Sequence, residues 1–354
     1  MYHRLRAKSS ATNYGYTYDA SGNRTQLTIG ASNYAYTIAT TSNRLTATAG
    51  PSPARSFTFD SAGNVTADGI DTWSFNARGR MASTTIGANT VNYTYDGLGQ
   101  RVIKSGPTAL VPGGTLYYVY DTQGHLLGEY DSSGTVIQEY VYLNDALLAI
   151  VKGTTSTPLI YYAYTDQIGR PWVITNTSDV AVWQWDTAPF GEFAPNQNPS
   201  GLGTFNMNLR FPGQYADSET SLNYNYFRDY DARVGRYPES DPIGLRGGIN
   251  TYLYGFANPV SFTDQTGEMA SLPQIIRNSV VIARAAAMNF IKREPKLPSG
   301  EPSLPPEGVS PPVKNPEQCK VGPSSRGEGK SLWDPEGGEW RYKGEDQWHN
   351  LNRP

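Results

Sequence analysis

Residues 93–104 read YTYDGLGQRVIK, and this stretch contains the pattern that decides the fold. Tyr93 and Tyr95 are two positions apart, so an extended strand carries both rings on one face. Asp96 and Gly99 then predict a turn, because an Asp side chain accepts bonds from nearby backbone N–H groups and glycine adopts positive φ without strain. The RVIK segment that follows is suited to a returning strand, so the whole stretch predicts a β-hairpin.

The same pattern recurs through the first half of the chain. The second aromatic residues of nine units are separated by 18, 23, 16, 20, 25, 22, 22 and 21 residues. One hairpin is not stable alone, so successive units are expected to pair edge to edge into a long sheet, and a curled sheet avoids a long exposed edge. The nine aromatic pairs are Tyr16/Tyr18, Tyr34/Tyr36, Phe57/Phe59, Trp73/Phe75, Tyr93/Tyr95, Tyr118/Tyr120, Tyr140/Tyr142, Tyr162/Tyr164 and Trp183/Trp185.

Composition agrees with an all-β protein. Of the 354 residues, 38% are hydrophobic and 17% charged, and Gly, Tyr and Pro number 36, 25 and 25. The formal net charge of −3 argues against general binding to nucleic acid or anionic lipid. Cys319 is the single cysteine, which excludes an intramolecular disulfide framework. The first residues, MYHRLRAKSS, lack an apolar core, so any export is expected to use a route without a signal peptide.

The repeated units resemble the tyrosine-aspartate repeats of the bacterial Rhs family. The turns YDASGNR (18–24), FDSAGNV (59–65), YDGLGQR (95–101) and YDTQGHL (120–126) carry this resemblance. It implies a β-sheet that curls into a hollow shell. Most of the tyrosines are expected to be packing residues, with a carbohydrate-binding aromatic platform as the functional alternative.

The segment 205–268 breaks the period and is dense in turn residues, although a short helix is expected near Ser221–Arg228. RFPGQYADSETSLNYNYFRDYDARVGRY (210–237), DPIGL (241–245) and NTYLYGFANP (250–259) are very similar to the Rhs repeat-associated core domain. In that family this domain plugs the shell and acts as an aspartic protease on its own chain. The resemblance implies that Asp241 and Asp264 are the catalytic pair, that Arg228 supports them, and that the cut falls near Glu268 and Met269.

Two carboxyls brought together cannot both ionise cheaply, so one holds a proton while the other deprotonates a water molecule. A guanidinium beside them orients the pair. This chain departs from the DPxGL motif of the family, because DQTGE (264–268) has Gln for Pro and Glu for Leu. Both changes argue against cleavage. Turn formation is the alternative role of Asp241 and Asp264, since Asp-Pro and Asp-x-x-Gly are common in turns.

The composition changes after Met269, as expected where a constant core meets a variable toxin segment. Residues 272–292 predict a helix, packed on the shell wall or in contact with a membrane during entry, but too short in its apolar run for a stable span. Nine prolines lie between Pro295 and Pro323 and predict an extended linker.

The last segment contains LWDPEGGEWR (332–341) and WHN (348–350), and it resembles the C-terminal motif of a polymorphic toxin family suspected of nuclease activity. Glu339, Arg341, Asp346 and His349 are the candidate residues, able to supply acid, base and phosphate-binding charge. A structural aromatic cluster is the alternative. No metal motif and no cofactor is expected, and nucleic acid is a partner only if this tail is a nuclease.

Together these features predict an all-β protein with five parts. They are tyrosine-aspartate repeats (1–190), an Rhs core plug (191–268), a helical segment (269–294), a Pro-rich linker (295–330) and a toxin-like motif (331–354). The function expected is a shell fragment that encapsulates and presents a toxin segment in contact-dependent competition between bacteria. It would be cytoplasmic before export, then secreted or at the cell surface, with secretion machinery and an immunity protein as partners. The alternative is a non-catalytic adhesive protein that binds carbohydrate.

Overall fold

The computed structural model describes residues 6–9, 12–51, 53–154 and 156–271, and four strands beyond residue 319. It divides into two units, Met1–Ala287 and Met288–Pro354, and each is described by itself. The described residues contain no α-helix, which confirms the all-β prediction. Three short 3-10 turns occur, η1 (Pro112–Gly114), η2 (Gly244–Arg246) and η3 (Gly255–Ala257).

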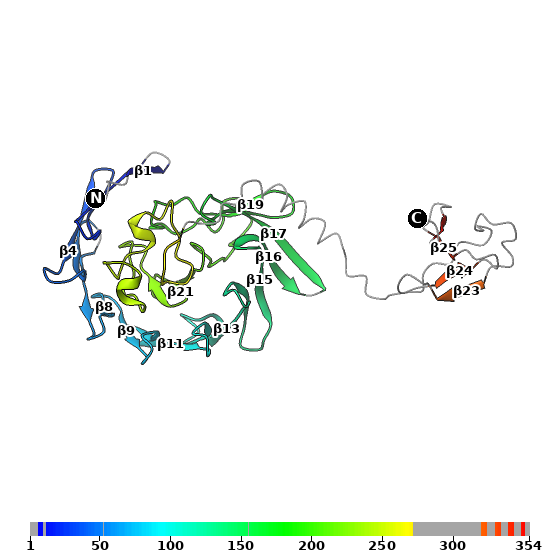
Figure 1. Ribbon diagram of the computed structural model, residues 1–354, viewed down its shortest axis with the longest axis horizontal. Coiled ribbons are helices and arrows are strands. Elements are labelled where there is room, and N and C mark those ends of the chain that lie inside the picture. The colour runs from blue at the N-terminus through cyan, green and yellow to red at the C-terminus, as the bar shows by residue number, and fades with distance from the viewer. Residues whose placement is uncertain are drawn as a thin grey trace. The chain divides into compact units, whose positions relative to one another are not determined.

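The repeats form two antiparallel sheets in which every strand pairs with its neighbours in sequence (Figure 1). The first sheet has the order β1 (Arg6–Ser9), β2 (Thr12–Tyr18), β3 (Arg24–Ile29), β4 (Ser32–Ile38), β5 (Leu45–Ala49) and β6 (Arg55–Ser56). The second sheet has thirteen strands: β7 (Thr58–Phe59), β8 (Val65–Ala67), β9 (Thr72–Phe75), β10 (Met81–Ile86), β11 (Asn89–Tyr95), β12 (Arg101–Ser105), β13 (Thr115–Tyr120), β14 (Leu126–Tyr130), β15 (Val136–Leu143), β16 (Ala146–Thr154), β17 (Thr157–Thr165), β18 (Pro171–Thr175) and β19 (Ala181–Gln184).

Several of the repeat turns are held by an aspartate within the turn itself. In the β11–β12 turn, Asp96 Oδ1 accepts bonds from the backbone N–H groups of Leu98 (2.9 Å) and Gln100 (2.8 Å). Gly99 has φ +86°, a conformation that glycine adopts at little cost. The same pair of bonds, to the second and fourth residues after the aspartate, recurs at Asp19, Asp121, Asp131 and Asp166. The repeat pattern therefore fixes the hairpin locally.

The aromatic pairs have two different roles. The first ring is buried in six units, at Tyr16, Trp73, Tyr93, Tyr118, Tyr140 and Trp183. In two units the second ring bonds to the adjacent strand: the Tyr95 hydroxyl donates to the Met81 carbonyl (2.7 Å) and the Tyr120 hydroxyl to the Arg101 carbonyl (3.0 Å). The burial of the first rings supports the packing role predicted for them.

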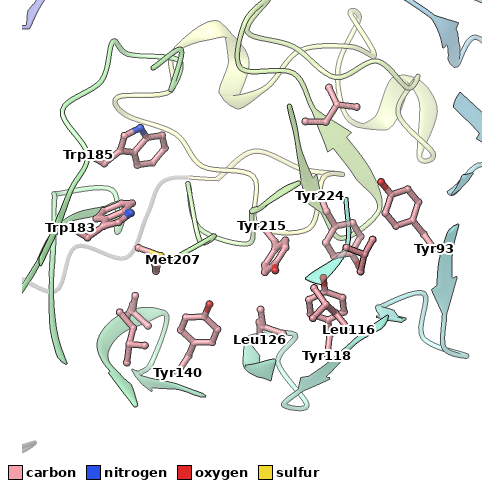
Figure 2. Close-up of a cluster of buried hydrophobic side chains, with 14 of the residues drawn as sticks. Tyr93, Leu116, Tyr118, Leu126, Tyr140, Trp183, Trp185, Met207, Tyr215 and Tyr224 are labelled. Atoms are coloured by element: carbon pink, nitrogen blue, oxygen red, sulfur yellow. The ribbon is translucent and has the colours of Figure 1, made fainter. Parts of the chain in front are cut away.

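The turn-rich segment 205–268, called the inner segment below, packs against these rings. It contains a third sheet made of β20 (Tyr215–Asp217), β21 (Leu222–Asn225) and β22 (Arg228–Tyr230). Figure 2 shows Tyr215 and Tyr224 of this sheet among Tyr93, Tyr118 and Tyr140 of the repeats. The Tyr118 and Tyr215 rings meet edge to face at 5.2 Å.

The helix expected near Ser221–Arg228 is wrong. Ser221 and Tyr226 have positive φ, 56° and 54°, which a helix does not allow, and they bracket β21. All four residues of β21 are buried. The sequence of β21, Leu-Asn-Tyr-Asn, alternates apolar and polar residues, but four residues are too short a run for periodicity to distinguish a strand from a short helix.

Buried ion pairs fasten the inner segment to the second sheet. Arg101 Nη2 lies 2.9 Å from Asp217 Oδ1, and Lys104 Nζ lies 2.9 Å from the same oxygen. Tyr93 donates to Glu219 Oε1 at 2.9 Å. Burial alone would raise the pKa of Asp217, but the two cations outweigh it and lower that pKa below its usual range.

The second unit contains one antiparallel sheet, β23 (Lys320–Pro323), β24 (Lys330–Trp333), β25 (Glu339–Tyr342) and β26 (Trp348–Asn350). Strand β23 falls inside the range predicted as a Pro-rich linker, whose remainder up to residue 329 lies outside the described residues. The helix predicted over 272–292 also lies outside them.

We expect Asp217→Asn to lower the free energy of unfolding by about 3–5 kcal/mol at neutral pH, because it leaves two buried cations undercompensated. The pKa of Asp217 is depressed in the folded state, so its contribution is present above the ordinary pKa of aspartate and is lost as the pH falls. Urea unfolding of both chains should therefore show a difference that narrows with acidification. Asp131→Asn, which keeps a turn acceptor, is the control and should change stability by less than about 0.5 kcal/mol.

Candidate active site

Arg228 joins the two aspartates that the sequence singled out. Its Nη2 lies 3.0 Å from Asp241 Oδ2 and 3.3 Å from Asp264 Oδ2. The three side chains come from β22 and from two later turns, and all three are buried, with 3%, 7% and 2% of their surface exposed. The structure therefore brings Arg228, Asp241 and Asp264 together, as the resemblance implied.

Local hydrogen bonds hold Asp241 in place. Its Oδ1 accepts the Ile243 N–H (3.0 Å), and its own N–H donates to the Thr251 carbonyl (2.9 Å). Arg228 Nη1 donates to that same carbonyl at 2.9 Å. Asp241 thus forms a turn, the alternative role considered for it, and also faces the guanidinium.

The segment 264–268 is folded onto the same site. Asp264 Oδ1 accepts the N–H of Glu268 at 3.0 Å, and Arg228 Nε donates to the Gly267 carbonyl. The Phe227 N–H donates to the Thr266 carbonyl at 2.9 Å. The residues expected to precede the cut are therefore anchored by the groups expected to make it.

Gly247 brings the carbonyl of Glu268 close to Asp241. A Cβ placed on Gly247 would lie 2.3 Å from Asp241 Oδ2 and 3.0 Å from the Glu268 carbonyl oxygen. Both oxygens therefore line the space beside one α-carbon. A side chain at this position would fill the space beside both oxygens.

Two further buried residues support the aspartates and were missed by sequence reasoning. The Tyr237 hydroxyl donates to Asp264 Oδ2 (3.0 Å), and its ring lies 3.7 Å below the Arg228 guanidinium. Asn225 Nδ2 donates to the Asp264 carbonyl (2.9 Å) and to the Tyr237 oxygen (2.6 Å). No spacing in the sequence distinguishes this tyrosine from the many packing tyrosines, so only the fold could identify it.

Asp241 and Glu268 are two carboxyls of this site whose pKa values are raised. Burial raises the pKa of Asp241, with a smaller contribution from the negative charge of Asp264, while Arg228 opposes both. Burial also raises the pKa of Glu268, and the charges of Asp241 and Asp264 add to it. A carboxyl whose pKa is raised keeps its proton to a higher pH than an ordinary carboxyl does, and this suits it to donate that proton to a carbonyl oxygen.

The tail candidates are described only by their strand positions. Glu339 and Arg341 belong to β25 and His349 to β26, where Arg341 and His349 are directly paired. Asp346 lies outside the described residues. Across the described part of the chain, no group of three or more His, Cys, Asp or Glu could hold a metal ion. No helix in that part is long and apolar enough to cross a membrane.

The sequential β-hairpins around a turn-rich inner segment define the class of protein, a tyrosine-aspartate repeat shell. Residues 3–258 match the family model of the teneurin YD-shell, so the chain belongs to that family.

Named relatives agree with the repeat resemblance predicted from the sequence. The chain is 28% identical over 241 residues to double-stranded DNA deaminase toxin A of Burkholderia cenocepacia, covering 60% of this chain and 17% of the relative. It is 35% identical over 127 residues to toxin protein Tse5 of Pseudomonas aeruginosa, covering 36% and 9%. The solved Tc holotoxin pore of Photorhabdus luminescens shares the fold with a TM-score of 0.56 at 22% identity, covering 76% of this chain and 14% of that one. The chain thus spans less than a fifth of each of these proteins.

We expect Gly247→Ala to push Asp241 away from Arg228, because the new methyl would overlap Asp241 Oδ2. The overlap should cost about 1–3 kcal/mol of unfolding free energy, measured by urea denaturation. Gly97→Ala is a matched control, since nothing lies within 4 Å of its Cβ position and its backbone is not left-handed. Equal stability of the two variants would contradict the close approach at Gly247.

Proposed function

We propose that this chain is the shell and plug of a polymorphic toxin, and that it cuts its own backbone between Glu268 and Met269 to release the segment that follows. The observation that carries the proposal is the convergence of Asp241, Asp264 and the 264–268 backbone on Arg228. The fold and the toxin relatives support the class of protein, and the site supports the reaction.

The two aspartates divide the chemistry between them. Protonated Asp241 donates to the Glu268 carbonyl oxygen, which lies beside it at Gly247. Asp264 accepts bonds from Tyr237, Arg228 and the Glu268 N–H, which suits a carboxylate, and it takes a proton from the attacking water. Water oxygen bonds to the Glu268 carbonyl carbon. The bond to the Met269 nitrogen then breaks as Asp264 passes that nitrogen the proton it took from the water, and the hydroxyl formed on the carbonyl oxygen returns its proton to Asp241.

A single turnover is sufficient for this reaction. The scissile bond belongs to the same chain, so its effective concentration at the site is high without any substrate affinity. Cutting should be lost as the pH rises through the raised pKa of Asp241.

The first test is the appearance of a fragment. Incubation of the purified chain should release the 86 residues after Glu268, seen on a denaturing gel and verified by intact mass. Asp241→Asn should abolish the fragment because an amide cannot supply the proton. Asp121→Asn, in a turn of the repeats, should cut as the wild type does. A chain that stays whole at every pH, identical to Asp241→Asn, would refute self-cleavage.

The same proposal makes the residues after 268 the payload. We propose a toxin that is carried through export by secretion machinery, acts in competition between bacteria and is neutralised in the producer by an immunity protein. The tail residues Glu339, Arg341, Asp346 and His349 are proposed as its functional groups, with nucleic acid as their substrate.

The growth of bacteria that express the chain tests whether the segment after Glu268 is toxic. Cytoplasmic expression of the full chain should arrest growth, whereas a chain that ends at Glu268 should not, because it lacks the toxic segment. Colony counts after induction, with protein levels matched by immunoblot, provide the measurement. Healthy cells containing abundant full-length chain would contradict the toxin assignment and leave self-cleavage untouched.

A further inference from the structure

An isolated β-bridge closes the loop that contains the proposed cut. The Thr263 N–H donates to the Ser271 carbonyl (3.0 Å), and the Ser271 N–H donates to the Thr263 carbonyl (2.8 Å), in an antiparallel pair. The bond between Glu268 and Met269 therefore lies in a loop, residues 264–270, whose two ends are joined by backbone hydrogen bonds. Joining the ends of a loop restricts the positions that a bond inside it can occupy.

Thr263 is the fixed end of this bridge, because it is buried and the residues before it are tied down. The N–H groups of Ser261 and Phe262 both donate to the Asn258 carbonyl, at 3.2 and 3.1 Å. The Phe262 ring meets the Phe256 ring edge to face, with 5.3 Å between their centres. The Thr263 carbonyl is therefore presented from an ordered turn, and the residues after the cut pair with it.

The two sides of the scissile bond are held in different ways. Before the bond, a side chain of the site holds the backbone, since Asp264 Oδ1 accepts the Glu268 N–H at 3.0 Å. After the bond, side-chain burial contributes little, because Met269 is 58% exposed and Ser271 is exposed as well. The contact that holds this second side is the backbone pairing of Ser271.

We infer that the Thr263–Ser271 bridge positions the leaving side of the scissile bond, and that it recognises residue 271 through its backbone N–H. This inference rests on the self-cleavage proposed above. Hydrolysis requires the Glu268 carbonyl carbon and the Met269 nitrogen to stay beside the two aspartates, and a bond held on one side only can swing out of reach. Any residue with an N–H at position 271 satisfies the bridge, whatever its side chain. Proline does not, because it has no N–H.

Cleavage rates of the full chain test this backbone contact. Ser271→Pro should slow release of the fragment about tenfold, because it removes the N–H that the Thr263 carbonyl accepts. Ser271→Ala keeps that N–H and should cut within about twofold of the wild-type rate. Thr122→Pro, at an exposed turn position of the repeats, is the control for proline itself and should cut as the wild type does. A wild-type rate for Ser271→Pro, or equal slowing by Ser271→Ala, would overturn the inference.

Two further readouts separate positioning from damage to the site. Ser271→Pro changes no titratable group, so it should lower the rate by the same factor at every pH. In the non-cutting Asp241→Asn chain it should lower Tm by less than about 2 °C, because Ser271 is exposed. A changed pH profile would show that the proline disturbs the aspartates, and a larger fall in Tm would assign the lost rate to unfolding. Either result would overturn the inference.

Hydrogen exchange tests the bridge without any cutting. In the Asp241→Asn chain, the Ser271 amide hydrogen should exchange at least about tenfold more slowly than in a short peptide of the same sequence. An unprotected Ser271 amide would refute the bridge whatever happens to cleavage. A protected amide in a chain whose wild type never cuts would keep the bridge but refute self-cleavage, and with it the positioning role.

Discussion

Rings from the hairpins face the inside of the curved sheets, and only another part of the chain can cover them. Tyr93, Tyr118 and Tyr140 would otherwise expose a broad apolar surface to water. The inner segment meets this demand with rings of its own, among them Tyr215 and Tyr224 (Figure 2). The hairpin sheets therefore depend on the inner segment for their stability, and the inner segment depends on the sheets. This mutual burial is what places the turn-rich residues around Arg228 in a fixed geometry.

Buried ion pairs fix the alignment of the inner segment against the hairpins. Apolar rings can slide past one another at modest cost, whereas a buried ion pair is satisfied in only one arrangement. Asp217 meets both Arg101 and Lys104, and Tyr215 donates to Glu129 Oε2 at 2.7 Å. Such contacts fix which part of the inner segment lies against which hairpin. The positions of Asp241 and Asp264 beside Arg228 therefore depend on how the inner segment is aligned with the hairpin sheets.

The repeats could be predicted because their signals are local. An aromatic pair, an aspartate and a glycine determine a hairpin without reference to distant residues, and the bonds at Asp96 show that mechanism. The helix expected near Ser221 was wrong because the buried strand β21 depends on contacts from both sides. Arg228, Asp241 and Asp264 were found through resemblance. Tyr237, Asn225 and Gly247 could not be, because their importance arises from three-dimensional proximity among residues of common type.

Because an aspartate satisfies the backbone N–H groups of its own turn, the structure of such a hairpin is determined by its own residues. Adding or deleting one hairpin disturbs only its pairing with the strands on either side. Other repeat architectures behave in the same way, because their stability is approximately the sum of the stabilities of the repeats and of the contacts between adjacent repeats. Gene duplication can thus lengthen such a wall in steps without redesigning its interior. The inner segment has no such freedom, since Asp217 must find Arg101 and Lys104 at one particular hairpin. Growth is therefore easiest at the end of the array far from those anchors.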